Sequence, residues 1–106
     1  MTSSEEIARK LDALWRTHLP AIRSRLETIG QALDYLEAGR LEDELRFKAA
    51  HDAHKLAGSL GTFGLASSSA NSSKIESLLT EEPPTQSLIA DLRNLFESVS
   101  RDISNR

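Results

Sequence analysis

The chain has 106 residues, the usual size of one domain, and its 39% apolar and 5% aromatic content favours a core of Leu, Ile and Ala. Thirteen Lys and Arg oppose sixteen Asp and Glu, so a net charge of -3 offers no broad positive field to nucleic acid or to an anionic membrane. No apolar run approaches the roughly 20 residues that span a bilayer, and the first residues lack a secretory signal pattern, so a cytoplasmic protein is expected. The absence of Cys excludes disulfides and thiolate chemistry.

Two amphipathic helices are predicted before residue 40. The first is short, and Ser3 or Ser4 can cap its N-terminus. The second begins at Pro20, which suits the first turn of a helix, and it stops at Gly39. Their apolar stripes are Ile7, Leu11, Leu14 and Trp15 in the first helix and Ile22, Leu26, Ile29, Leu33 and Leu36 in the second.

Three further helices are predicted after Gly39. The third begins near Leu41 and ends within residues 61–64, the fourth runs roughly over residues 65–79, and the fifth follows a connection at residues 81–84. Pro83 and Pro84 mark that connection, because two consecutive prolines cannot continue a helix. The apolar stripes are Leu45, Ala49, Ala53, Leu56 and Leu60 in the third, Leu65, Ile75, Leu78 and Leu79 in the fourth, and Leu88, Leu92, Leu95, Phe96, Val99 and Ile103 in the fifth.

These elements predict an all-α fold in one domain that spans residues 1–106. Helices joined in pairs by short Gly and Pro turns indicate an up-down-up-down four-helix bundle, and the short additional N-terminal helix is expected to cap one end of it. Trp15 is expected in the core, where it packs that first helix onto the bundle. The serines between residues 67 and 73 are interpreted as sites of close packing and solvated helix edge.

The third predicted helix carries the most informative side chains, centred on His54. With about 100° per residue, the apolar positions of this helix lie opposite His54, so the imidazole is expected to point away from the core. Phe47 lies on the same side, where it either anchors a partner or is covered by the N-terminal helix. The residues within about 60° of His54 on the helical wheel are Asp43, Phe47, Ala50, His51, Ala57, Gly58 and Gly61.

Gly58 stands out because glycine in a helix interior costs on the order of 1 kcal/mol relative to alanine. It lies four residues after His54, which places it beside the imidazole on the helix surface. A missing side chain there exposes the ring and allows a partner to approach closely. The helix is therefore interpreted as a docking face.

An exposed imidazole suits the transient carriage of a phosphoryl group, because its neutral nitrogen is nucleophilic near neutral pH. The chain has no Gly-rich nucleotide loop and no carboxylate cluster for magnesium, so no cofactor of its own is expected and a partner must bring these parts. Lys55 and Lys48 flank one side of His54 and can offset the phosphoryl charge. His51 and His54 supply two metal ligands at most, so no metal site is expected.

The run from His54 to Gly64, which reads HKLAGSLGTFG, resembles the signature of histidine-containing phosphotransfer (HPt) domains. The matching positions are His54, Leu56, Gly58, Ser59 and Gly64. The resemblance implies that His54 is the phosphoacceptor, on the second helix of a four-helix bundle. It also implies a response-regulator receiver domain or a sensor histidine kinase as the partner, with magnesium bound to the receiver.

The sequence departs from the family pattern at two positions. Ala57 stands where the family usually has a basic residue, and Leu60 replaces the second small residue. Lys55 is expected to substitute in part for the missing basic residue. Together with Gly58 and His51, which are neighbours of His54 on the helix, it is expected to support the phosphoryl site. The expected docking positions are Phe47, Ala50, Ala57 and Gly61.

Two other interpretations remain open at this point. A purely structural adaptor would bind a partner helix with the same face and without chemistry. The chain is also consistent with a segment of a longer sensor kinase or hybrid regulator. A monomeric phosphocarrier that is not itself an enzyme is the expected protein.

Overall fold

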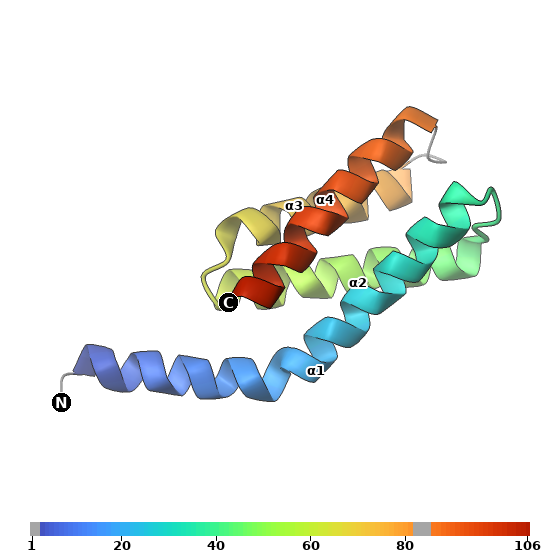
Figure 1. The fold of residues 1–106 in the computed structure, drawn as a ribbon. Helices are drawn as coiled ribbons and strands as arrows, with labels where there is room; N and C mark the ends of the chain where they lie inside the picture. Colours follow the sequence, from blue (N-terminus) through green and yellow to red (C-terminus); the bar gives the residue numbers. More distant parts are fainter. Residues whose placement is uncertain (1–2, 82–85) are drawn as a thin grey trace.

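The computed structural model describes residues 3–81 and 86–106, which form four α-helices and no strand (Figure 1). The predicted all-α four-helix bundle is therefore confirmed. The helices are α1 (Ser3–Glu37), α2 (Asp43–Thr62), α3 (Ala66–Glu81) and α4 (Gln86–Asn105). Glu81 is the last residue of α3, and the rest of the connection expected at residues 81–84 lies outside the described residues.

Helix α1 is continuous through Pro20, so the separate N-terminal helix expected from the sequence is instead the first part of α1. A proline inside a helix removes one backbone hydrogen bond and crowds the preceding turn, which bends the helix without always ending it. Figure 1 shows such a bend in α1. Trp15 and Ile22 are buried on either side of the proline, so packing holds both parts in one helix.

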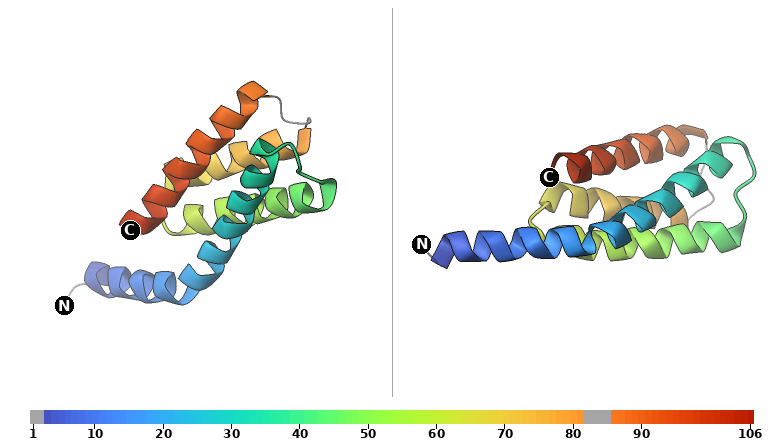
Figure 2. Two further views of the ribbon diagram at one scale, coloured as in Figure 1. Left: turned by 45° about the vertical axis from the view of Figure 1, so that its right-hand side comes forward. Right: turned by 60° about the horizontal axis from the view of Figure 1, so that its bottom comes forward.

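The first turns of α1 extend past the end of the bundle at which the C-terminus lies (Figure 2). The molecule consequently measures 55 × 20 × 20 Å. Trp15 packs edge-on against Phe63 with ring centroids 5.2 Å apart, and it is only 5% exposed, which confirms its predicted place in the core. Ile7 and Leu14, nearer the N-terminus, are 58% and 49% exposed.

Two glycines with positive φ end α1 and α2. Gly39 has φ 70° and Gly64 has φ 82°, a left-handed conformation that glycine adopts without steric cost. The residue after each glycine closes the helix end, because Arg40 N–H donates to Tyr35 C=O and Leu65 N–H donates to Leu60 C=O. These caps confirm the predicted stop at Gly39 and place the reversal after α2 at Gly64.

The described parts of the helices pack in a ring, α1 against α2, α2 against α3, α3 against α4 and α4 against α1. Aliphatic side chains fill the centre: Ile22, Ile29 and Leu33 from α1, Leu56 and Leu60 from α2, Ile75 and Leu79 from α3, and Leu92 and Val99 from α4. None of the four helices, as far as the structure describes them, is long and apolar enough to cross a membrane.

The serines of α3 serve the packing of this helix against its two neighbours. Ser68 is fully buried and donates a 2.6 Å hydrogen bond to Asp102 of α4. Ser69 donates a 2.7 Å hydrogen bond to the carbonyl of Ala57 in α2. Small side chains thus bring α3 close to α2, as the interpretation of this serine stretch requires.

Candidate functional site

His54 lies near the middle of α2, on the side of this helix that faces away from the core. Its side chain is 68% exposed, whereas Leu56 and Leu60 on the opposite side are fully buried. The Nδ1 atom of His54 lies 3.1 Å from Oε1 of Glu76 on α3. The imidazole therefore reaches solvent while one of its nitrogens is held by a neighbouring helix.

Glu76 is a site residue that the sequence pattern does not reveal, because it stands 22 positions after His54 on another helix. A carboxylate only accepts hydrogen bonds, so the contact requires a proton on Nδ1. In the neutral ring the other nitrogen, Nε2, then carries the free lone pair. The contact thus selects the tautomer whose nucleophilic nitrogen is Nε2.

Gly58 is exposed, and a Cβ added to it would meet no atom within 4 Å. The surface beside His54 is therefore open, as the spacing of His54 and Gly58 predicts. Gly61 is in a different setting, because a Cβ there would lie 3.2 Å from Oγ of Ser69. Gly61 consequently serves the close approach of α2 and α3, although it is also exposed at the surface.

Ala50 is 2% exposed, so the expected docking role of Ala50 is wrong. Helix α3 packs closer to this side of α2 than an ideal wheel with the core opposite His54 suggests. Hydrogen bonds of 2.7 Å cross this contact from Arg46 to the carbonyl of Leu79 and from Ser69 to the carbonyl of Ala57. Ala57 is half-buried as a result, and the open face of α2 is turned away from α3.

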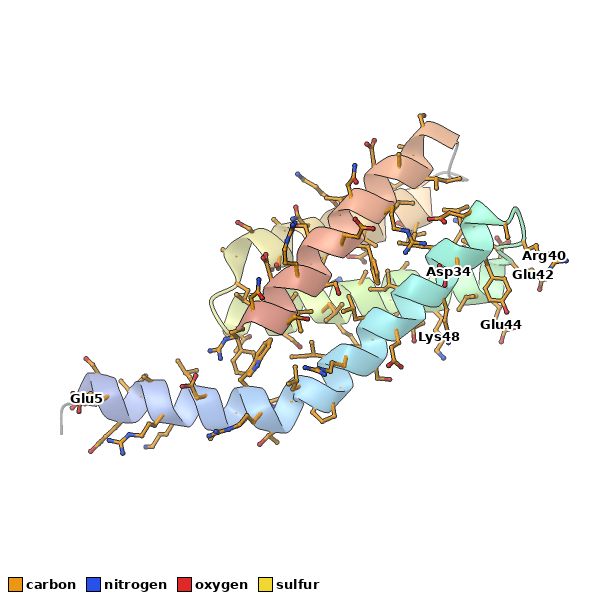
Figure 3. The ribbon with its side chains drawn as sticks, in the orientation of Figure 1. Glu5, Asp34, Arg40, Glu42, Glu44 and Lys48 are labelled. Carbon is orange, nitrogen blue, oxygen red and sulfur yellow. The ribbon has the colours of Figure 1, made fainter. Side chains whose placement is uncertain are left out.

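Two lysines and a second histidine lie near His54 on the open face of α2. The side chains of Lys48, His51 and Lys55 are exposed and form no hydrogen bond or ion pair with any residue in the described ranges. Lys48 extends outward from the bundle (Figure 3). Lys55 directly follows His54, and adjacent residues on a helix do not face one another. Lys55 therefore borders the imidazole rather than facing it.

Phe47 lies on the same face, and its side chain is 50% exposed. The N-terminal part of α1 therefore leaves the ring open, so the alternative in which this helix covers Phe47 is wrong. The described residues contain no group of three or more His, Asp or Glu side chains that could hold a metal ion. His51 and His54 thus have no third ligand within that part of the chain.

The fold and the site together define a four-helix bundle with an exposed, carboxylate-bound histidine near the middle of α2. The model of the Hpt domain family matches residues 13–102, well over half of the chain, and the chain therefore belongs to this family. The match includes His54, Gly58 and Glu76 and begins within α1. Hpt domains are phosphotransfer modules of two-component signalling. Comparison with curated proteins and with solved structures gave no match.

Proposed function

We propose that His54 carries a phosphoryl group in a phosphorelay, between the aspartates of two receiver domains or from a sensor kinase to a receiver. The observation that carries this proposal is the exposed imidazole whose Nδ1 is held by Glu76, beside the open surface at Gly58. Membership of the Hpt family supports the same chemistry.

In the proposed step, the Nε2 lone pair of His54 attacks the phosphorus of an aspartyl phosphate on the receiver. A P–N bond forms, the P–O bond to aspartate breaks, and the aspartate leaves as a carboxylate. Because Nε2 carries no proton in this tautomer, no proton has to leave during attack. The ring becomes cationic, and the carboxylate of Glu76 stabilises this charge through the Nδ1–H hydrogen bond.

The chain is proposed to act as a carrier that depends on its partner for the rest of the chemistry. Phosphoryl transfer requires in-line positioning and neutralisation of charge, which magnesium commonly supplies. We assign the magnesium ion to the receiver. Lys55 is proposed to add modest positive charge at the edge of the site, and His51 is proposed to line that edge.

The test is to incubate the chain with a panel of receiver domains that carry labelled phosphate. At least one receiver should transfer an acid-labile, base-stable label to the wild-type chain. His54→Gln should abolish the label with unchanged helicity, while His51→Gln, on the same exposed face, should retain it. Labelling of the His54→Gln variant would contradict the proposal. An unlabelled wild-type chain across the panel would favour the adaptor, which binds partners without chemistry.

A further inference from the structure

Phe47 is the large exposed apolar side chain on the same face as His54. It precedes His54 by seven residues, which is about two turns and roughly 10 Å along the helix axis. Its side chain is 50% exposed. The other large apolar side chains of comparable exposure in the described residues, Ile7, Leu14 and Tyr35, are all on α1.

The ring of Phe47 is held by its neighbour Arg46. The guanidinium carbon of Arg46 lies 4.4 Å from the centre of the ring. The guanidinium is itself fixed by hydrogen bonds of 3.1 and 3.2 Å to Asp43 and of 2.7 Å to the carbonyl of Leu79 on α3. The Arg46 side chain is only 16% exposed. A solvent-exposed aromatic ring thus rests on a cation that is anchored to two helices.

Such an arrangement is suited to binding, because a group already held in its bound orientation loses little conformational freedom when a partner arrives. Aromatic residues and arginine are also enriched in the core of protein interfaces. Arg46 links α2 to α3, but the exposed half of the Phe47 ring adds no burial to the bundle, since it remains in water. Its benefit is therefore expected in a complex.

We propose that Phe47 is the anchor that positions the receiver domain on α2 and that Arg46 is the positioning residue for its ring. This inference rests on the proposed phosphotransfer at His54. A specific interface buries about 800 Å² on each partner, a disc of roughly 16 Å radius. A receiver centred on His54 therefore covers a ring about 10 Å away. The expected contact on the receiver is an apolar pocket beside its phosphorylated aspartate.

The first test compares transfer rates over a range of chain concentrations, using the receiver that labels the wild-type chain fastest in the panel. Phe47→Ala should raise the concentration for half-maximal rate by about tenfold or more, the size of effect typical of an interface anchor. The maximal rate should change little, because His54 and Glu76 are untouched. Tyr35→Ala, which removes a ring of 49% exposure on α1, is the matched control and should leave both values unchanged.

The second test separates the positioning role of Arg46 from a general effect on the fold. Arg46→Met keeps the aliphatic stem and removes the guanidinium, so it should raise the half-maximal concentration less than Phe47→Ala does. The double variant should match Phe47→Ala alone, because Arg46 acts through the ring. If the double variant raises the half-maximal concentration by the product of the two single effects, Arg46 does not act through the ring and the positioning role is contradicted. Phe47→Ala decides the main proposal even where Arg46→Met unfolds, since a half-exposed ring leaves no cavity behind.

Failure of this inference is distinguishable from failure of the phosphotransfer itself. Phosphoramidate, a small donor that needs no docking, should label His54 equally in the wild type and in Phe47→Ala. If Phe47→Ala also shows wild-type concentration dependence with the receiver, Phe47 is not the anchor although His54 remains the acceptor. If neither donor labels His54, the proposed phosphotransfer fails and this inference fails with it.

Discussion

Oε1 of Glu76 lies 3.1 Å from Nδ1 of His54, and this contact joins α3 to the exposed ring on α2. It restricts the rotation of the imidazole and determines which ring nitrogen is free. The carboxylate is 33% exposed, so solvent screens part of its charge. Glu76 is therefore expected to orient the ring and to have a moderate effect on the rate of transfer.

Glu76→Ala is expected to slow phosphoryl transfer to His54 by about threefold to fivefold, because an exposed charge contact is worth at most about 1 kcal/mol. Glu76→Gln should be closer to wild type, since its amide oxygen can still accept from Nδ1–H. Single-turnover transfer from one phosphorylated receiver measures both effects. Glu97→Ala, which removes an exposed carboxylate on α4, is the control. Equal rates in wild type and Glu76→Ala would remove Glu76 from the mechanism.

Replacement of Gly58 by alanine should preserve the fold, whereas replacement by glutamate should block phosphoryl transfer. A Cβ at Gly58 meets no atom within 4 Å, so Gly58→Ala should raise the free energy of unfolding by about 0.5–1 kcal/mol through better helix propensity. Gly61→Ala should raise the free energy of unfolding by less, because its Cβ would lie only 3.2 Å from Oγ of Ser69. Thermal unfolding measures both.

Gly58→Glu should fold and yet block transfer, because a long charged side chain then covers the surface beside His54. The measurement is transfer from the same receiver, with circular dichroism as the test of folding. A folded Gly58→Glu variant that accepts phosphate at the wild-type rate would place the docked partner elsewhere.

The positive charge near His54 is expected to act weakly and in a salt-dependent way. Lys55→Ala should slow transfer and Ala57→Lys should accelerate it, each by at most about fivefold, because one exposed charge is worth at most about 1 kcal/mol. Both effects should shrink at high salt, since exposed charges are screened beyond about 8–10 Å at physiological ionic strength. Lys74→Ala on α3 is the control, and rates are compared at low and high salt. Unchanged rates in both variants would make Lys55 a solvated side chain without a role.

Arg93 is expected to stabilise the contact between α4 and α1. Its guanidinium lies 2.7 Å from Oε1 of Glu37 and 2.9 Å from Oδ1 of Asp34. The hydrogen bond to Glu37 is the main cause that raises the pKa of Arg93. This stabilisation is present below the ordinary pKa of arginine and is lost only as the pH rises through the higher folded-state pKa. Arg93→Ala should lower the free energy of unfolding by about 1 kcal/mol, because both carboxylates are partly exposed.

Urea denaturation near neutral pH measures the Arg93 effect. Arg101→Ala, on the exposed side of α4, should change stability by less than about 0.5 kcal/mol. If the two variants unfold at the same urea concentration, the ion pairs of Arg93 contribute nothing to the fold.

Much of the fold follows from local sequence signals. The apolar stripes locate α2, α3 and α4, and Gly39 marks the end of α1, because these signals depend on helical spacing and on one backbone conformation. The continuity of α1 through Pro20 could not be predicted in this way. The local cost of proline favours a break, whereas burial of Trp15 and Ile22 on either side keeps one helix, and that packing becomes visible only in the folded chain.

The site is less predictable, because its partners come from different helices. The exposure of His54 and the open surface at Gly58 follow from the spacing within α2. Glu76 and the burial of Ala50 both depend on how closely α3 packs against α2, which no periodicity within one helix specifies. Ala50 in particular lies on the arc that an ideal wheel assigns to solvent.

The most direct test of the account is NMR spectroscopy of the chain labelled with ¹⁵N in its histidines, before and after phosphoryl transfer from a receiver. The sequence contains three histidines, His18, His51 and His54, so each ring can be assigned. We expect that phosphorus couples to Nε2 of His54 alone and that Nδ1 of this ring keeps its proton. Phosphorus on Nδ1 of His54, or on the ring of His51 or His18, would contradict it.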